Sequence, residues 1–431
     1  MSARQTDVTP TAHFAELFAT DGFPYPRTQE RLAALERLHR SGFPLRHDET
    51  WSHTPLQELV RQRYRLPSAA NTARQPATAL VYPGGWRAWE DLNPCLVVDG
   101  GSLAAAASRP AGVTSHATDP TTNFQQGTQT AFSQLNQMFA PPVDEVVVPM
   151  AGERPWRAHY ANLISAGVLA APRRGIVIPS GARATVVESY AARGEADSSN
   201  PSLCVPHTDI LVGAGAQLEL IRVQLEADSA YHVGSTNIVM AERSDVRVMT
   251  ADLGGKLARH TLSVLLAGSH ARCHLAGVTV AGGSQWADAQ TYVEHAEPGS
   301  SSRQLFKRVL TGAAGAVFAG RIVVRDIAQQ TDAFQLNNNL LLGSGRVVTL
   351  PQLEIAADDV RCSHGATVGQ LDEDQMFYLR ARGISPRMAT AMLAIGFTEE
   401  ALAQVADAEV RNNLGQLVRG RLTEQLEASQ S

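Results

Sequence analysis

The stretch Ser263–Val280, SVLLAGSHARCHLAGVTV, is the clearest indicator of the fold. It consists of two short apolar runs rich in Val and Leu, separated by a turn of small and polar residues. Similar stretches lie on both sides of it: GIVIPSGARATVVE (175–188), ILVGAGAQLELIRV (210–223), NIVMAERSDVRVMT (237–250), RVLTGAAGAVFAGRIVV (308–324) and NNLLLGSGRVVTL (338–350). Apolar runs of this length between turn residues predict β-strands.

The turns between these runs recur with a loose period. The turn markers are Gly181, Gly215, Ser244, Ser269, Gly299 and Gly345, spaced by 34, 29, 25, 30 and 46 residues. Gly315 divides the last interval into 16 and 30. Such a repeat is typical of a β-solenoid, in which each coil stacks its inward side chains on the next. A sandwich or barrel built from hairpins fits the same runs, so the periodicity leaves both folds open.

The region before the repeats is predicted to be mainly helical. Arg27–Arg40 has leucines three residues apart with charged residues between them, and Gln57–Arg63 predicts a second, short helix. Thr121–Phe139 predicts a third helix. Two short apolar runs, Thr78–Tyr82 and Cys95–Val98, are suited to strands.

Helical patterns return after the repeats. Asp372 is placed to cap one helix, and Ser385 to cap a second, which we expect to end at Gly396. Thr398 is expected to cap a third helix that continues to about Leu426. The chain therefore divides into a helical and mixed region (1–150), a β region (151–368) and a helical region (369–431).

The composition is that of an ordinary globular protein, with 44% hydrophobic and 18% charged residues. The net charge of −5 and the lack of a basic cluster argue against nucleic acid or an anionic membrane as a partner. The N-terminal residues lack a signal-peptide pattern, and no apolar run is long enough to span a membrane. We therefore expect a cytoplasmic protein. The four cysteines lie far apart, which predicts neither a disulfide framework nor a self-contained metal site.

The chain shows none of the common enzyme signatures. It has no P-loop, no GxSxG elbow and no HExxH motif, and we expect it not to be an enzyme. Asp358 and Asp359 are adjacent, so on a strand they would point to opposite faces, and a turn or cap suits them better than paired acid–base chemistry.

Three cysteines have a histidine nearby: Cys204 with His207, Cys273 with His274, and Cys362 with His364. The last pair is separated by two residues, so on a strand both side chains emerge on one face. A thiolate and an imidazole suit iron or zinc, but two ligands do not complete a tetrahedral site. The residues alone leave open a shared metal site and an ordinary packed strand end.

The longer string around this pair, PQLEIAADDVRCSHGATVGQLDEDQMFYLRARGIS (351–385), resembles the signature of the SufB/SufD family of iron–sulfur cluster assembly proteins. FAGRIVVRDIAQQTDAFQLNNNLLL (318–342) matches as well, as does PLRHDETWSHTPL (44–56). The Cys-x-His-Gly-Ala-Thr pattern at 362–367 is that of SufD-like members. SufB-like members have a sulfur-accepting cysteine just before the residues that match Leu340–Leu342, and here 335–339 contains no thiol.

The resemblance implies a right-handed parallel β-helix flanked by helical domains, in a cytoplasmic complex with SufB and the ABC-type ATPase SufC. It implies that His364, and secondarily Cys362, face SufB and are iron ligands for a nascent iron–sulfur cluster that is transient and not stably bound by this chain alone. A reduced flavin in the complex and a homodimer of the isolated chain are compatible with it. The C-terminal helical unit is implied to dock SufC through Gln375, Phe377, Tyr378, Leu379, Arg380, Gly383 and Ile384.

Two alternatives to a ligand-bearing scaffold remain. A β-helix enzyme such as a polysaccharide lyase would need a cluster of charged residues along one face, which the sequence does not show. A purely structural partner, which stabilises SufB without supplying a ligand, is the closer alternative.

Overall fold

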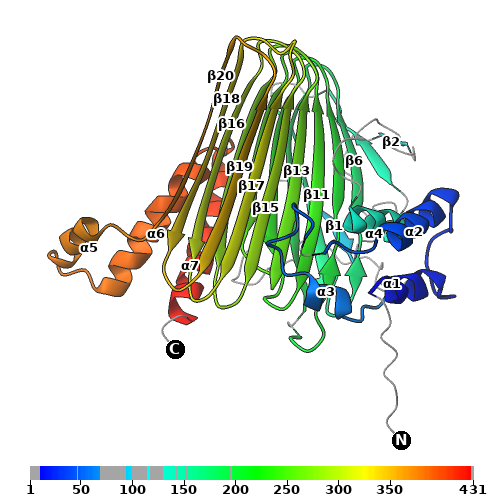
Figure 1. The fold of residues 1–431 in the computed structure, drawn as a ribbon, viewed down its shortest axis with the longest axis horizontal. Helices are drawn as coiled ribbons and strands as arrows, with labels where there is room; N and C mark the ends of the chain where they lie inside the picture. The colour runs from blue at the N-terminus through cyan, green and yellow to red at the C-terminus, as the bar shows by residue number, and fades with distance from the viewer. Residues whose placement is uncertain are drawn as a thin grey trace, which may run out of the picture.

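The structure is a computed structural model that describes residues 10–45, 47–67, 94–99, 114–116, 130–141, 143–150, 154–194 and 197–428. Its centre is a two-sheet parallel β-helix, with helices near both ends of the chain (Figure 1). The chain alternates between the sheets, so each coil adds one strand to each. The predicted β-helix is therefore confirmed, and the parallel pairing rules out a sandwich or barrel of hairpins.

The strands of the first sheet, in spatial order, are β1 (Pro94–Val98), β4 (Trp156–Ser165), β7 (Arg183–Arg193), β10 (Gln217–Leu225), β12 (Asp245–Asp252), β14 (Arg272–Ala281), β16 (Ser301–Leu310), β18 (Thr331–Leu341) and β20 (Val360–Gly369). Those of the second are β2 (Thr114–His116), β3 (Asp144–Val147), β6 (Arg173–Ile178), β9 (His207–Val212), β11 (Tyr231–Met240), β13 (Leu257–Leu266), β15 (Trp286–His295), β17 (Gly315–Val324) and β19 (Arg346–Ile355). Two short strands, β5 (Leu169–Ala170) and β8 (Leu203–Cys204), extend the second sheet. Thus β20 and β19 are edge strands of the two sheets.

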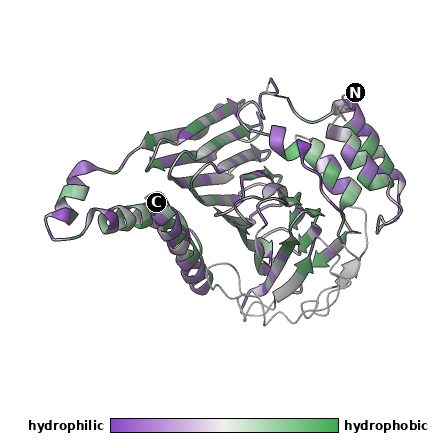
Figure 2. Cartoon of the chain, turned by 90° about the horizontal axis from the view of Figure 1, so that it is seen from below, coloured by the Kyte–Doolittle hydropathy of each residue, from purple (hydrophilic) through white to green (hydrophobic). Residues whose placement is uncertain are grey.

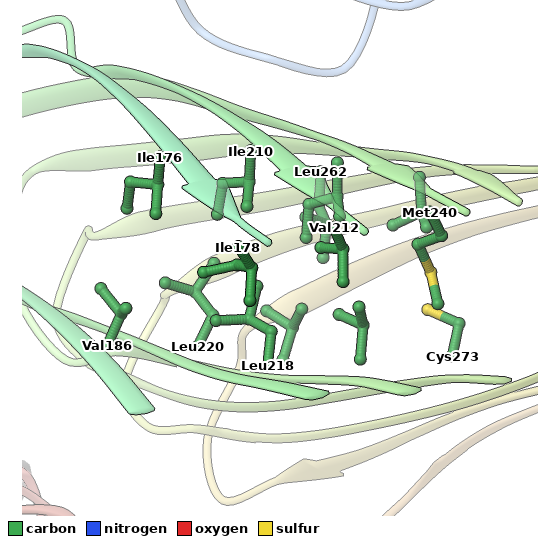
Figure 3. Packing of buried hydrophobic residues seen from close by; sticks show 14 of the residues in the cluster. Ile176, Ile178, Val186, Ile210, Val212, Leu218, Leu220, Met240, Leu262 and Cys273 are labelled. Atoms are coloured by element: carbon green, nitrogen blue, oxygen red, sulfur yellow. The ribbon is translucent and has the colours of Figure 1, made fainter. Parts of the chain in front are cut away.

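The core lies between the sheets and is built from columns of equivalent side chains. Val186, Leu220, Val248 and Leu275 are register partners on successive strands of the first sheet, and all are buried. A matching column on the second sheet is Ile210, Ile238, Val264 and Val293. Figure 3 shows the two inner faces meeting, with the sulfur atoms of Met240 and Cys273 close together. Full burial of one such aliphatic side chain contributes about 1.5–3 kcal/mol.

One corner of the coils is formed by a column of residues with left-handed backbone. Gly181, Gly215, Arg243, His270, Gly299 and Gln330 all have φ between +54° and +74°. The amide of each donates a hydrogen bond to a carbonyl at the same corner of the next coil, as from Gly215 to Glu242 (2.9 Å) and from Arg243 to Ser269 (2.9 Å). These bonds align the coils, and the left-handed backbone turns the chain from one sheet to the other.

This column corrects the predicted turn markers. Gly181, Gly215 and Gly299 are corner residues, but Ser244 and Ser269 each lie one position from the true corner residue. Gly345 does not belong to this corner, where the equivalent residue is Gln330. Glycine was the signal for a left-handed turn, and three of the six corners use another residue, so the spacing looked less regular than it is.

The N-terminal helices are α1 (Pro10–Ala19), α2 (Gln29–Ser41), α3 (Gln57–Arg61) and α4 (Ala131–Phe139). Their apolar faces share one core with the starts of second-sheet strands, including Leu203, Tyr231 and Leu257. The predicted helices at 27–40 and 57–63 are confirmed, with α2 shifted to 29–41 and α3 ending at Arg61. Helix α4 confirms the last part of the predicted helix at 121–139. The strand predicted at 78–82 and residues 121–129 lie outside the described residues.

The C-terminal helices are α5 (Glu373–Arg380), α6 (Pro386–Leu402) and α7 (Ala408–Ala428). The predicted caps are present, since Asp372 Oδ1 accepts from the amide of Gln375 and Ser385 Oγ from that of Met388. The predicted helix end at Gly396 is wrong. Helix α6 continues to Leu402, because its buried alanines pack on the first sheet and outweigh the intrinsic cost of one glycine.

The predicted start of the third helix at Thr398 is also wrong. Thr398 is fully buried inside α6, and its hydroxyl donates to the carbonyl of Ile395 (2.8 Å). Asp407 caps α7 instead, because its Oδ1 accepts from the amides of Glu409 and Val410. Among the described residues, we find no helix that is both long and apolar enough to cross a membrane.

The corner column and α6 predict opposite effects for the same substitution at two glycines. Gly215→Ala should lower the free energy of unfolding by about 1–2 kcal/mol, because an L-residue is disfavoured at φ +64° although the space is open. Gly396→Ala, in the middle of α6 with no atom within 4 Å of the added carbon, should raise it by about 0.5–1 kcal/mol. Urea denaturation of both variants measures the two effects. An unchanged Gly215→Ala variant would contradict the role of the corner.

Candidate functional site

The last coil of the β-helix is uncovered at the end of the stack, where the strand order of both sheets stops. Strands β19 and β20 are each paired on one side only within the described residues. Asp358 and Asp359 lie at the bend that joins them, where the amide of Asp359 donates to Gln329 Oε1 (2.9 Å) and its carbonyl accepts from the amide of Gln330 (2.6 Å). The expected turn role of these aspartates is therefore confirmed. Ile355 and Val368 on the two strands are 42% and 50% exposed.

Cys362 and His364 lie on β20, on the face that continues the interior of the β-helix. Their register partners on β18 are Ala333 and Gln335, which are both buried between the sheets. Because no described strand pairs with β20 on its other side, Cys362 is only half-buried and His364 is exposed. The structure thus places both side chains on one face at the open end of the β-helix.

The two side chains differ in their surroundings. Cys362 packs beside Leu353 and Val360, against a cluster that includes Ile322 and Ala333. Burial, with a smaller contribution from nearby Asp332, raises the pKa of the Cys362 thiol above its ordinary value. A neutral thiol is a poor metal ligand until it loses its proton. The exposed His364 imidazole is the more accessible of the two side chains.

The other two Cys–His pairs do not form sites. Cys273 is buried in the core, and burial raises the pKa of its thiol. His207 bonds Ser235 (2.7 Å) and Asp209 (2.9 Å) rather than Cys204.

Cys204 instead lies close to Glu226 and His232, and this buried cluster was missed by sequence reasoning. His232 is the register partner of Cys204 one coil later, 28 residues on, so an accurate repeat length would have revealed it.

The Cys204 cluster is a completed polar network rather than a metal centre. The Arg222 guanidinium donates to His232 Nε2 (2.7 Å), so the ring proton is on Nδ1, which donates to Glu226 (2.8 Å). Burial and the neighbouring carboxylate of Glu226 raise the pKa of the Cys204 thiol well above its ordinary value. A cation here would have to displace two protons beside a guanidinium, which disfavours binding.

A second exposed feature is α5, which extends away from the β-helix (Figures 1 and 2). None of its residues is buried, and Phe377 and Tyr378 are 73% and 55% exposed. Met388 and Met392 on the neighbouring α6 are also largely exposed. A helix of eight residues with no buried face is marginal alone, and clustered exposed apolar side chains indicate an interaction surface.

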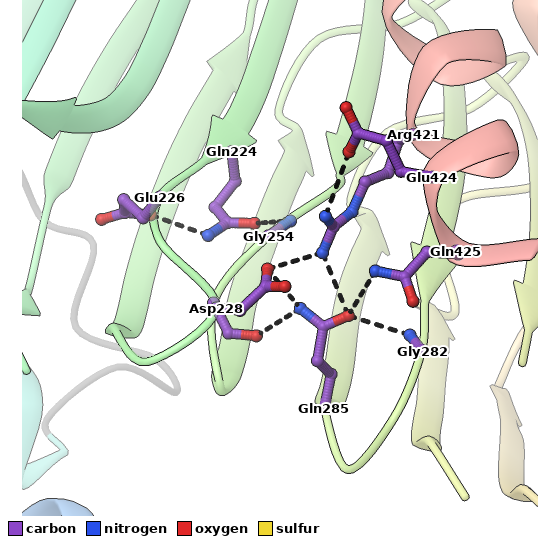
Figure 4. Close-up of polar contacts among 10 residues, drawn as sticks. Gln224, Glu226, Asp228, Gly254, Gly282, Gln285, Arg421, Glu424 and Gln425 are labelled. Carbon is purple, nitrogen blue, oxygen red and sulfur yellow. Dashed lines mark hydrogen bonds and ion pairs between the residues drawn. The ribbon is translucent and has the colours of Figure 1, made fainter. Parts of the chain in front are cut away.

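Helices α6 and α7, in contrast, are fixed to the β-helix. Their apolar residues share a core with the outer face of the first sheet. Arg421 of α7 donates to Asp228 (2.6 Å) and Gln285 (3.2 Å) on the coils, as Figure 4 shows. Glu219 accepts from the amides of Ala406 and Asp407 (2.5 and 3.2 Å) just before α7. In the C-terminal region, α6 and α7 thus pack on the β-helix, whereas α5 buries none of its residues.

A cavity of about 370 Å³ lies between residues 49–54 and the outer face of the second sheet. Its buried charge is already balanced, because the guanidinium of Arg259 pairs with Asp288. Trp51 lies between that guanidinium (3.7 Å) and the stacked ring of Phe132 (5.2 Å). Thr54 also donates to Asp288 (2.5 Å). These contacts attach the N-terminal segment to the β-helix and assign it a structural role.

The fold and the site together define a parallel β-helix protein with an uncovered last coil and an exposed helix α5 beside it. Comparison with known families gives the same class a name. Residues 162–397 match the model described as "SUF system FeS cluster assembly, SufBD core domain". The chain belongs to the SufB/SufD family.

Individual relatives point to the SufD-like branch. The chain is 30% identical to the iron–sulfur cluster assembly protein SufD of Escherichia coli over 95% of both chains. It is 30% identical to an iron–sulfur cluster assembly SufBD family protein of Synechocystis, covering 91% of this chain and 90% of the relative. It is 27% identical to the chloroplastic protein ABCI7 of Arabidopsis thaliana, over 94% and 88%.

The surroundings of the cysteines predict a reactivity order. At pH 7.5 Cys362 should react with iodoacetamide slowly, and its rate should still rise above pH 9, because burial raises its pKa and the thiolate is the nucleophile. Cys204 and Cys273 should remain protected in the folded protein. Mass spectrometry of digested samples follows each cysteine, with the urea-unfolded chain as the control. Rapid labelling of Cys362 that levels off below pH 8 would contradict this account.

Proposed function

We propose that this chain is a scaffold subunit for iron–sulfur cluster assembly that works with SufB and the ATPase SufC. The observation on which the proposal rests is the position of His364 and Cys362 on the inner face of the uncovered edge strand β20. Family membership supports a role in iron–sulfur cluster assembly, since the relatives are named as iron–sulfur cluster assembly proteins. The cluster is the cargo of this assembly rather than a resident cofactor.

The open coil is the proposed contact with SufB. An edge strand has a row of backbone amides and carbonyls without strand partners, and another strand can satisfy them. The exposed Ile355 and Val368 add apolar area at the same edges. A second β-helix placed here would continue both sheets and would enclose His364 between the two proteins.

Within that interface His364 is the proposed ligand of this chain. Its imidazole is exposed on a rigid strand, and a neutral imidazole nitrogen binds iron. Cys362 is ranked second, because its thiol packs into the coil and its pKa is raised. One or two ligands do not hold a cluster, so the remaining ligands, including the sulfur-accepting cysteine, would come from SufB.

The arm around α5 is the proposed contact with SufC. The residues implied by the family resemblance include the exposed Phe377 and Tyr378, while α6–α7 join the arm to the outer face of the first sheet. Movement of a partner bound at α5 would therefore be passed through α6–α7 to the last coils. ATP-driven movement of SufC would open and close the interface that contains His364.

A purely structural partner of SufB is the alternative. The exposed apolar side chains at β19 and β20 would stabilise such a contact without any ligand. A ligand-bearing scaffold and a purely structural partner predict different results when the His364 imidazole is removed. Cluster assembly would fail only for the first, although the protein complex would still form in both cases.

His364→Ala should lower the rate of cluster assembly by the reconstituted three-protein complex by roughly tenfold or more, since disturbing even the outer shell of a metal site costs that much. Size-exclusion chromatography should show the complex intact. Ser363→Ala, the adjacent exposed residue on the same strand, is the matched control and should assemble clusters normally. An unchanged rate in His364→Ala would establish the structural alternative instead.

Phe377→Ser should weaken the binding of SufC by roughly 30-fold, the effect of removing one aromatic residue at the centre of an interface. Its own stability should stay unchanged, because this side chain is 73% exposed in the isolated chain. Leu32→Ser, at an exposed apolar position of α2, controls for the general loss of apolar surface. Isothermal titration with purified SufC measures both, and equal affinities for the two variants would exclude α5 as the docking site.

A further inference from the structure

Within the described strands, three arginines occupy inward positions of the β-helix, and two of them have carboxylate partners. Arg174 pairs with Glu188 (2.5 Å), and Arg222 pairs with Asp252 (2.8 Å). The third, Arg308 on β16, is 1% exposed. None of its three guanidinium nitrogens has a hydrogen-bond partner within the part of the chain that the structure describes.

Arg308 points into the space between the sheets in the last coils. Its register partner on β18 is Asn339, and its guanidinium lies 5.2 Å from the ring of Phe318 on the second sheet. Asn337, on the same inner face of β18, is also buried, and neither its amide nitrogen nor its amide oxygen has a partner among the described residues. Buried polar atoms without partners, which include the Arg308 guanidinium, the Asn337 amide and Asn339 Oδ1, therefore lie on these two neighbouring strands.

The two carboxylates that interact electrostatically with Arg308 are already paired with other arginines. Asp252 accepts from Arg222, and Asp288 accepts from Arg259 on the outer side of the second sheet. They act on Arg308 only at a distance, and burial lowers the pKa of this guanidinium to about 10, at which it is still charged at neutral pH. A buried cation without a partner is strongly unfavourable, so a compensating negative charge is required inside the coil.

We propose that Arg308 and Asn337 form an internal binding site for a small monovalent inorganic anion of the size of chloride. A single positive charge calls for a single negative one, since a divalent anion would leave net charge buried. Because packed sheets lie about 10 Å apart, an ion held beside these side chains has to be compact. Ala316, the inner-face residue two positions before Phe318, has only a methyl side chain. The site does not depend on the proposed function.

Chloride should stabilise the folded full-length chain. At constant ionic strength, replacing gluconate by chloride should raise the melting temperature in a saturable way, by roughly 2–4 °C. In Arg308→Met, which keeps the length of the side chain without its charge, the chloride effect should vanish. The melting temperature of this variant in gluconate should be at or above that of the native chain, because its buried charge is gone. Differential scanning calorimetry measures both quantities.

Arg303→Met is the matched control, because Arg303 lies on the outer face of the same strand and bonds exposed Asp332. Its chloride effect should equal that of the native chain. Crystals of the native protein soaked in bromide provide a test that does not require any variant to fold. An anomalous peak within hydrogen-bonding distance of the Arg308 guanidinium is expected. Density for water alone there, together with a melting temperature indifferent to chloride, would overturn the proposal.

Discussion

In-register parallel stacking is the constraint on which this structure depends. Each strand pairs with the equivalent strand of the next coil, so an inward residue lies beside an equivalent residue of that coil, as Leu218 does beside Val246 (28 residues on) and Val246 beside Cys273 (27 residues on). A position in the interior is therefore specified by its column as well as by its own burial. Aliphatic columns such as the one through Leu220 satisfy this requirement by packing alone, at about 1.5–3 kcal/mol for each buried side chain.

The same stacking explains why several polar side chains inside the coils find their partners on neighbouring coils. Arg222 reaches Asp252 on the next strand of its own sheet and His232 on the facing sheet. Burying a polar group without such a partner lowers the free energy of unfolding, and apolar packing does not offset this loss. Cys204, Glu226 and His232 meet for this reason, and their proximity reflects the register of the coils rather than metal chemistry.

Much of the fold could be predicted from the sequence, because apolar runs, caps and turn residues are local signals. The caps at Asp372 and Ser385 were identified correctly for that reason. The predictions were wrong where tertiary contacts determine the backbone conformation or the length of a helix. Arg243, His270 and Gln330 adopt a left-handed backbone that the residue type does not indicate, and packing on the first sheet takes α6 past Gly396. The spacing of Cys362 and His364 predicted a shared face, but their different exposure follows from β20 being the last strand, which only the complete topology shows.

The position of the last strand also links the site to the helical arm. Strand β20 leads directly into α5, so the edge that exposes His364 and the helix that exposes Phe377 are consecutive in the chain. Helices α6 and α7 then return to the outer face of the first sheet, where Arg421 and Glu219 bind them to the coils. Helix α5 is thus connected at one end to strand β20 and at the other to α6, which packs on the first sheet. A partner that moves α5 would act on β20 through covalent connection on one side and through the bound helices on the other, so that displacement reaches the open coil rather than being absorbed by a flexible tail.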